Sequence, residues 1–340
     1  MQTKLLAVRR GNTRGGSAGA QQRESAAHSS TGNILVMLII RRALALLFFA
    51  AAARAQTADW ADGAFFTYSA TPNVVYGTAG GQELKLDIYR PRNASAPVPV
   101  VMHIHGGGWV VGSKESEMLN ILPYLALGMA VVNVEYRLGG ATPAPAAVED
   151  CRCALRWIVR NADRYKFDAN RIVVTGMSAG GHLSLMTGML PASAGFDRSC
   201  PAGADIRWEG VDRREPRVAA IISWFGITDV RDMLDDAPNA RSYAIEWIGN
   251  RDDAAQIAAK VSPLTYVRAG LPPILIIHGD SDKTVPPSHA TRLHEALQKA
   301  GASSQLLLLP GAGHGNLTPA QSRQAYDAVR AFLAKAGIIK

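Results

Sequence analysis

The chain has 340 residues, of which 48% are hydrophobic and 19% charged, and its formal net charge is +8. The positive charge gathers near the N-terminus. Residues 1–55 hold eight Lys or Arg and one Asp or Glu, so residues 56–340 carry 28 basic and 27 acidic side chains. A nearly neutral body excludes the strongly basic surface typical of a nucleic-acid-binding protein. Its length and apolar content suit one domain with a single sizeable core.

The first 55 residues resemble a leader more than a part of the folded domain. Residues 1–36 are polar, rich in Gly and Ser and aperiodic, so we expect them to be disordered or to precede the true translation start. Residues 37–55 combine basic residues, a short apolar run and a small-residue pattern, which is typical of a signal peptide cleaved near Ala55-Gln56. A pair of arginines shortens the apolar run below the roughly 20 residues that span a bilayer, which disfavours a stable membrane anchor. We therefore expect a secreted or periplasmic domain at 56–340.

Strand-like and helix-like segments alternate through that domain. Apolar or β-branched runs predict strands at 84–89, 98–104, 129–134, 171–175, 218–225, 273–277 and 305–309. The first of them alternates apolar and polar residues, as an edge strand does. Helices are predicted at 146–162, 179–190, 288–300 and 320–336. The pattern indicates an α/β fold with a mainly parallel sheet and helices on both faces.

Two longer segments, 192–216 and 228–261, interrupt the alternation. Segments of this length inside a compact domain are often lids or binding loops. We expect the second to form a small cap over the functional site.

The most specific motif is Gly176-Met177-Ser178-Ala179-Gly180, directly after the predicted strand at 171–175. A strand, a sharp turn and a helix in this order raise the serine hydroxyl clear of the sheet edge, where a substrate carbonyl can reach it. The two glycines allow the strand and helix backbones to pass where a β-carbon would clash. The motif predicts Ser178 as a nucleophile.

A second Gly-rich segment, His105-Gly106-Gly107-Gly108-Trp109, follows the predicted strand at 98–104. Backbone N–H groups directed at a carbonyl oxygen stabilise the negative charge that develops in acyl transfer, and losing one donor costs about 3 kcal/mol. We expect Gly107 and Gly108 to supply two such donors and Ala179 a third. Without the serine motif, a simple structural turn would explain the segment equally well.

Two C-terminal segments offer the partners that a serine nucleophile needs. His314 is flanked by glycines after the predicted strand at 305–309, and Asp280 and Asp282 follow the strand at 273–277. Histidine, with an ordinary pKa of about 6.5, can take the hydroxyl proton, and a carboxylate fixes its tautomer. The order Ser178, Asp, His314 is that of α/β-hydrolases.

These motifs resemble those of α/β-hydrolase esterases in the hormone-sensitive-lipase-like and feruloyl and acetyl-xylan esterase-like group. The resemblance spans residues 70–338 and is carried mainly by HGGGW at 105–109, GMSAGGH at 176–182, HGDSD at 278–282 and GH at 313–314. It implies the α/β-hydrolase fold, Asp282 as the acid of the triad, and Gly107, Gly108 and Ala179 as oxyanion donors. It also implies a carboxylesterase that hydrolyses short-chain or carbohydrate-linked esters through an acyl-Ser178 intermediate.

Three tryptophans are candidates for the substrate pocket: Trp109, Trp224 and Trp247. Trp109 follows the glycines of the expected oxyanion loop and Trp247 lies in the expected cap, but each could instead be a structural residue. The other histidines are assigned structural positions: two in apolar strands (His103 and His278), one packed after the nucleophile (His182) and two on a surface helix (His289 and His294).

No grouping of His, Asp or Cys has metal-ligand spacing, and no phosphate-binding loop occurs, so we expect neither metal nor cofactor. Cys151 and Cys153 are two apart in a predicted helix and diverge, so they cannot easily bridge each other. In an oxidising compartment either one can pair with Cys200, and buried free thiols are the alternative.

Three other functions compete with the esterase interpretation. A lipase would need a larger apolar entrance. An amidase or peptidase, similar to kynurenine formamidase or prolyl peptidases, would use the same triad. A non-catalytic binding module is the weakest alternative, because such modules usually lack a triad residue and here all three are present. The sequence leaves the oligomeric state open.

Overall fold

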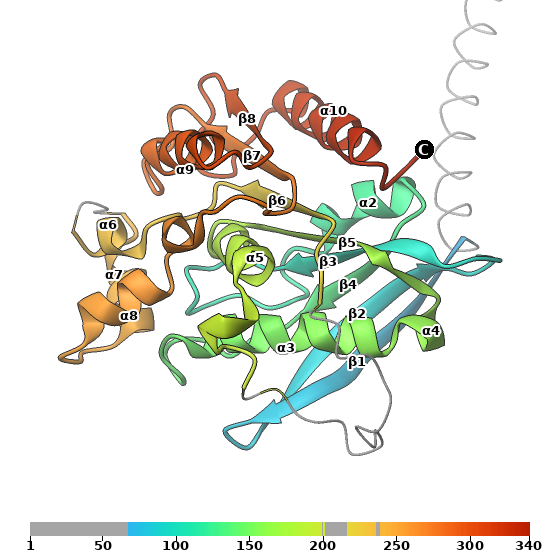
Figure 1. Cartoon of the computed structure of the whole chain (residues 1–340), viewed down its shortest axis with the longest axis horizontal. Helices are drawn as coiled ribbons and strands as arrows, with labels where there is room; N and C mark the ends of the chain where they lie inside the picture. The colour runs from blue at the N-terminus through green and yellow to red at the C-terminus, as the bar shows by residue number, and fades with distance from the viewer. Residues whose placement is uncertain (1–66, 199, 201–215, 236–238) are drawn as a thin grey trace, which may run out of the picture. The chain divides into compact units, whose positions relative to one another are not determined.

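An eight-stranded sheet organises the residues that the structure, a computed structural model, describes: 67–198, 200, 216–235 and 239–340. Its strand order is β1-β2-β4-β3-β5-β6-β7-β8, and from β4 to β8 all neighbours are parallel (Figure 1). β1 and β2 pair antiparallel, as do β2 and β4. The strands are β1 Tyr68–Ala79, β2 Gln82–Pro91, β3 Val98–Ile104, β4 Ala130–Val134, β5 Phe167–Met177, β6 Ala220–Trp224, β7 Ile274–Gly279 and β8 Ser304–Leu309.

The predicted apolar runs form the centre of this sheet because parallel strands are covered on both faces. Every residue of β4, β6 and β7 is buried. The alternating segment at 84–89 is not the edge strand: it lies in β2, between β1 and β4. β1 forms the edge and was not predicted, because most of its residues are exposed or half-buried and it contains no sustained apolar run.

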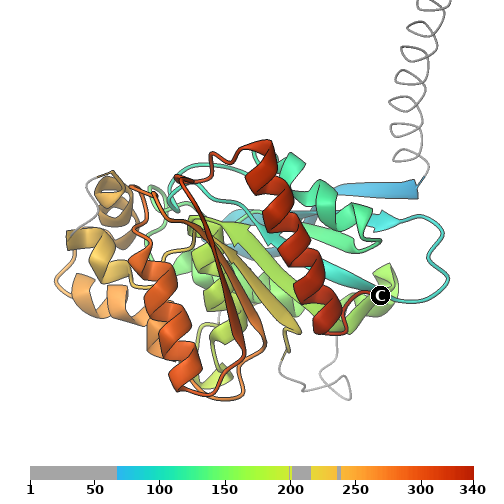
Figure 2. The ribbon, with the colours of Figure 1, turned by 90° about the horizontal axis from the view of Figure 1, so that it is seen from above.

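Helices cover both faces of the sheet, as predicted (Figure 2). Successive residues of a strand point to opposite faces. Val100 and Met102 of β3 accordingly pack in the core beneath α3 and α5, whereas Val101 packs in the core beneath α2 and α10. α9 packs with α5 in a third apolar cluster. These helices are α2 Leu122–Ala126, α3 Ala146–Arg160, α5 Ala179–Met189, α9 Ser288–Lys299 and α10 Pro319–Lys335.

Among the described residues between β6 and β7, where the sequence predicts a cap, lie three short helices: α6 Val230–Asp235, α7 Arg241–Ile248 and α8 Ala254–Lys260. The remaining helical segments are short: α4 Ala162–Tyr165 and the 3-10 turns η1 Met118–Ile121, η2 Ala192–Ala194 and η3 Pro263–Tyr266. The predicted leader at 1–55 lies outside the described residues. Within the described part of the chain, no helix is both long and apolar enough to cross a membrane.

A disulfide joins Cys153 of α3 to Cys200, which leaves Cys151 as a buried free thiol. The same segment is held to α3 by Asp197, whose carboxylate pairs with Arg152 at 2.7 Å and Arg156 at 2.6 Å. Either cysteine could have made the bridge on sequence grounds. Only Cys153 does, since side chains two residues apart on a helix point in different directions and Cys151 is left fully buried away from Cys200.

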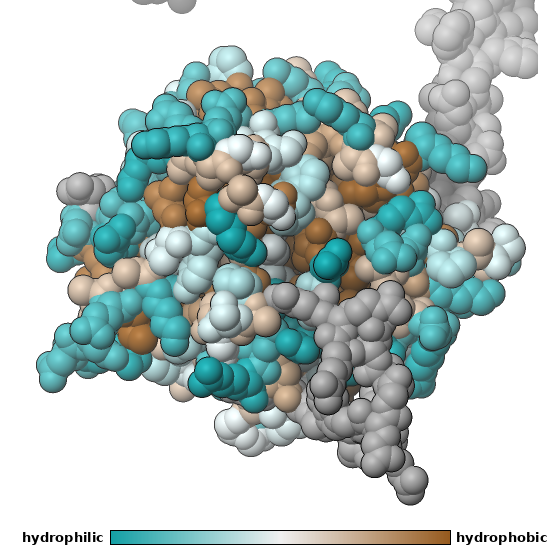
Figure 3. Space-filling model, in the orientation of Figure 1, coloured by the Kyte–Doolittle hydropathy of each residue, from teal (hydrophilic) through white to brown (hydrophobic). Residues whose placement is uncertain are grey.

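The surface is mixed in character. The face shown in Figure 3 is mostly hydrophilic, with separate hydrophobic patches.

Candidate active site

Ser178 occupies a strained turn between β5 and α5. Its backbone has φ 56° and ψ −119°, a conformation that non-glycine residues rarely adopt, and its N–H donates to the carbonyl of Trp224 at 2.8 Å. A β-carbon on Gly176 would lie 2.2 Å from the carbonyl oxygen of Ile104, and one on Gly180 only 2.1 Å from it. The two glycines therefore let β3 pass against the turn and hold the serine in its raised position.

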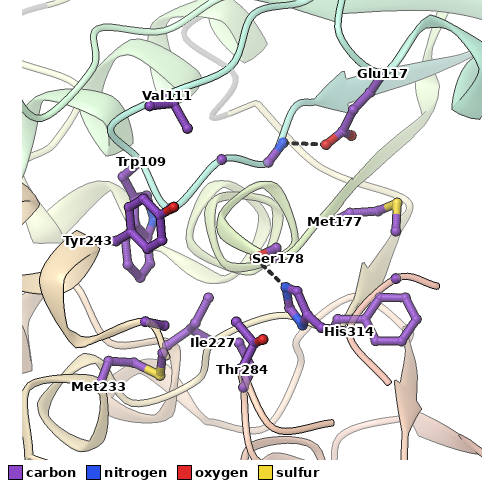
Figure 4. A pocket seen from close by; sticks show the side chains of 17 residues that line it. Trp109, Val111, Glu117, Met177, Ser178, Ile227, Met233, Tyr243, Thr284 and His314 are labelled. Carbon is purple, nitrogen blue, oxygen red and sulfur yellow. Dashed lines mark hydrogen bonds between the residues drawn. The ribbon is translucent and has the colours of Figure 1, made fainter. Parts of the chain in front are cut away.

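The structure brings Ser178, His314 and Asp282 into one hydrogen-bonded chain, of which Figure 4 shows the bond between Ser178 and His314. His314 Nε2 lies 2.8 Å from Ser178 Oγ, and His314 Nδ1 lies 2.7 Å from Asp282 Oδ2. The loops that carry these residues follow β5, β7 and β8, whose carboxyl ends meet at one edge of the sheet. This geometry is the one in which an imidazole can accept a hydroxyl proton while a carboxylate holds its tautomer.

The environment of Asp282 keeps its carboxyl group ionised. The side chain is fully buried, which by itself opposes ionisation. Hydrogen bonds from the imidazoles of His278 and His314 outweigh that effect and hold the pKa of Asp282 well below its usual range. The other oxygen, Oδ1, accepts from the backbone N–H groups of Thr284 at 2.8 Å and Val285 at 2.9 Å.

Asp280, the competing carboxylate, points elsewhere. Its Oδ1 accepts from the N–H of Gly311 at 2.7 Å and from the hydroxyl of Ser281 at 2.9 Å. It thereby joins its own loop to the loop that leads to His314, whereas Asp282 contacts the imidazole.

The glycines after β3 form a tight turn beside Ser178. Gly107 and Gly108 have φ of 106° and 58°, and a β-carbon on Gly107 would lie 2.0 Å from the carbonyl oxygen of Val111. The carbonyl of Gly107 accepts from two later amides in the turn, whereas the N–H groups of Gly107 and Gly108 have no backbone acceptor in the loops that the structure describes. Ala179, the third expected donor, is the first residue of α5, where backbone N–H groups lack helical partners.

A cavity of about 290 Å³ opens beside these groups. In Figure 4, Glu117 and Met177 lie on one side of Ser178, and Tyr243, Ile227 and Met233 lie on the other. Most of the lining is apolar, and α6 and α7 contribute to it. The lining residues are Gly106, Gly107, Gly108, Trp109, Val111, Glu117, Met177, Ser178, Phe225, Ile227, Met233, Ala240, Tyr243, Thr284, Val285, His314 and Gly315.

Of the three candidate tryptophans, only Trp109 lines the cavity. Trp247 is fully buried behind it, with ring centroids 4.3 Å apart and planes 9° from parallel. Trp224 packs instead against Tyr326 of α10, because its side chain points to the opposite core. The expectation that Trp224 and Trp247 line the pocket is therefore corrected.

His182 connects the glycine turn to the C-terminal end of α8. The indole N–H of Trp109 donates to His182 Nδ1 at 3.0 Å, and His182 Nε2 donates to the carbonyl of Val261 at 2.6 Å. Burial lowers the pKa of His182 to about 4, so the ring stays neutral and can accept at Nδ1. Trp247 lies edge-on to the same imidazole. The glycine turn, α5, α7 and the end of α8 thus meet at one buried imidazole.

Glu117 was not singled out in the sequence. Its Oε1 accepts from the N–H of Gly106 at 2.8 Å, and its Oε2 lies 3.6 Å from His103 Nε2. No motif marks this contact, since it joins η1 to the glycine turn across a loop. Among the described residues, no group of three or more His, Cys, Asp or Glu is arranged to hold a metal ion.

Comparisons with known proteins agree with this geometry. The family model BD-FAE matches residues 86–297. Esterase LipC of Mycobacterium tuberculosis is 30% identical over 256 residues, and the match covers 71% of this chain and 59% of LipC. Isoprenylcysteine alpha-carbonyl methylesterase ICME of Arabidopsis thaliana is 26% identical over 263 residues, or 74% of this chain and 58% of that protein. The chain thus spans about 60% of the length of these relatives.

The matches to solved structures cover a larger share of the matched chains than the matches to these relatives do. A truncated carbohydrate esterase from gut microbiota has a TM-score of 0.67 at 29% identity and covers 80% of this chain and 97% of that one. Esterase Est2 of Thermogutta terrifontis, in a propionate-bound structure, has a TM-score of 0.63 at 28% identity and covers 78% and 94%. From its matched family model, its sheet order and these neighbours, the chain belongs to the BD-FAE family and has the α/β-hydrolase fold.

Proposed function

We propose that this protein is a serine carboxylesterase. The observation that carries the proposal is the hydrogen-bonded chain from Ser178 through His314 to Asp282, which opens into a cavity bordered by the glycine turn. The named relatives and neighbours are esterases, which supports ester hydrolysis as the reaction class.

The proposed reaction has two acyl-transfer steps. Ser178 Oγ attacks the ester carbonyl while His314 Nε2 takes its proton, and the amides of Gly107, Gly108 and Ala179 stabilise the oxyanion. The imidazolium then gives its proton to the departing alkoxide, which leaves as the alcohol. Water, deprotonated by the same imidazole, attacks the acyl-serine and releases the acid.

The cavity supports a short acyl group. Its volume lies near the lower end of the range for small-molecule sites, and its cap side is formed by apolar side chains. The propionate- and butyrate-bound Thermogutta structures concern acids of this size. We therefore propose acetyl to butyryl esters as the preferred substrates.

On the other side of Ser178, the Glu117 carboxylate borders the cavity and offers an acceptor to a hydroxyl-bearing alcohol. A carbohydrate-linked ester would supply such hydroxyls, and the gut carbohydrate esterase supports the idea by structural likeness. A secreted or periplasmic location, proposed from the leader at 37–55, would give access to such external substrates.

The test is hydrolysis by the residue 56–340 protein of p-nitrophenyl esters from acetate to palmitate, together with methyl ferulate and acetylated xylan. The Ser178→Ala variant serves as the matched control. We expect activity that is highest on short acyl groups and absent from the variant. Activity equal to that of the variant on every ester would refute the proposal, and hydrolysis of formyl or peptide amides instead would favour the amidase alternative.

Labelling with a fluorophosphonate provides an independent readout of the nucleophile. We expect one modified serine, Ser178, identified by peptide mass spectrometry. Modification that persists in Ser178→Ala would contradict its assignment.

A further inference from the structure

His278 lies near the end of β7, four residues before Asp282, the carboxylate of the proposed triad. The side chain is fully buried. Its Nε2 lies 2.9 Å from the carbonyl oxygen of Val285 and 3.3 Å from Asp282 Oδ2. Both neighbours are acceptors, so Nε2 carries a proton and donates.

This donor completes a closed set of contacts around Asp282. Oδ1 accepts from the N–H groups of Thr284 and Val285, while Oδ2 accepts from His314 and faces His278. Because His278 also binds the Val285 carbonyl, one imidazole holds both the carboxylate and the loop segment that orients it.

The other ring nitrogen of His278 shows that the position is not simply apolar packing. Nδ1 is buried and has no hydrogen-bond partner among the described residues. An unpaired buried polar atom is destabilising, and an aliphatic side chain in β7 would avoid this cost. A buried histidine at this position, with its unpaired Nδ1, is accounted for if its Nε2–H group is needed to hold Asp282.

We propose that His278 is a positioning residue for the esterase reaction proposed above, on which this inference rests: its Nε2–H shares Asp282 Oδ2 with His314 and fixes the direction of the carboxylate. It has a second effect on charge. A donor on Oδ2 withdraws negative charge that would otherwise attract the His314 imidazolium. The titratable groups around His278 are Asp282 and His314 in the adjoining loops and His289 of α9.

Three variants test the donor itself. His278→Gln can place an amide N–H near the position of Nε2, whereas the shorter His278→Asn cannot reach it and His278→Leu has no donor. We expect kcat to fall about tenfold in the Leu and Asn variants, the effect of one lost hydrogen bond, with little change in KM. The Gln variant should recover most of the loss.

The pH profile separates positioning from a merely structural role. A carboxylate with one donor fewer stabilises the imidazolium more strongly, so the acidic limb of kcat/KM should move to higher pH by about half a unit in the Leu and Asn variants. An unchanged limb in soluble, folded Leu and Asn variants would overturn the proposal. If the Leu variant does not fold, the kcat and pH profile of His278→Gln are compared with those of His278→Asn, and an unchanged limb in the Asn variant still overturns the proposal.

A readout without turnover distinguishes this inference from the proposed function. The Nδ1 proton of His314, shared with Asp282, is expected to give a downfield proton NMR signal in the wild type and to shift in His278→Leu. If the wild type is inactive, the esterase proposal is refuted, but the NMR signal of the His314 Nδ1 proton still tests whether His278 positions Asp282. A signal at the same position in both proteins would refute the role of His278.

Discussion

Two buried histidines should make the stability of this protein depend on pH within a defined window. His182 and His289 are 0% and 1% exposed, and burial lowers the pKa of each to about 4. An unfolded chain returns both to about 6.5. Between pH 6.5 and 4 the unfolded state therefore binds protons that the folded state does not. The stabilisation is complete above the unfolded value and is lost as pH falls.

The magnitude follows from the two pKa values. One pKa unit corresponds to about 1.4 kcal/mol, so each histidine contributes about 3 kcal/mol that disappears across the window. The depressed pKa of Asp282 acts at lower pH, because its stabilisation is present above the unfolded value of about 3.9 and is lost only below it. The histidine effect should therefore dominate the upper part of the acid transition.

Urea unfolding at several pH values between about 7 and about 4.5 measures this effect as a slope in the free energy of unfolding. We expect His182→Gln and His289→Gln each to remove about half of the slope attributable to the two histidines, and the double variant to remove nearly all of it. Identical slopes in the wild type and the double variant would refute the reasoning, because neither histidine would then titrate differently in the two states.

Three further predictions concern the glycine turn, its support and the disulfide. Gly108→Ala should lower kcat about a hundredfold by displacing an oxyanion donor. The new β-carbon would lie 2.7 Å from Tyr243 Cγ, and the φ of 58° is one that alanine rarely adopts. Activity within threefold of wild type would contradict this prediction. Glu117→Leu should lower kcat about tenfold by freeing the Gly106 N–H, while Glu117→Gln, which retains an acceptor, should stay near wild type in the same steady-state assay. Cys153→Ser should lower the free energy of unfolding by about 4 kcal/mol in denaturant titrations, since the bridge closes a loop with a sequence separation of 47; a change below about 1 kcal/mol would show that the loop adds little entropy to the unfolded state.

Local sequence patterns predicted much of the fold. The apolar runs predicted the central strands because a parallel strand is buried on both faces, and the helical stretches between them predicted α3, α5, α9 and α10. β1 was not predicted, because an edge strand whose residues are mostly exposed or half-buried has no apolar run to mark it in the sequence. His289, predicted to lie on a surface helix, is buried because its imidazole faces the protein interior, where Nδ1 accepts from the backbone N–H of Thr228 at 3.2 Å.

The chemical motifs were predictable for a related reason. A nucleophile turn needs glycines at fixed offsets from Ser178, so its requirements appear within five consecutive residues. The residues that support the site are harder to find. His278 looked like an ordinary core residue of an apolar strand, and Glu117 belongs to no motif, because each acts through a contact that only the folded chain creates.

The sequence by itself determined the alternation of strands and helices, the serine turn, the glycine turn and the Ser, Asp, His order, since each depends on near neighbours or on chain order. The tertiary structure decided which of several equivalent residues makes each long-range contact. It directs Asp282 to His314 and Asp280 to Gly311, pairs Cys153 with Cys200, and places Trp109 alone of the three tryptophans at the cavity. Residues one or two positions apart differ little in sequence context but point in different directions on a strand, helix or turn, so packing makes the choice.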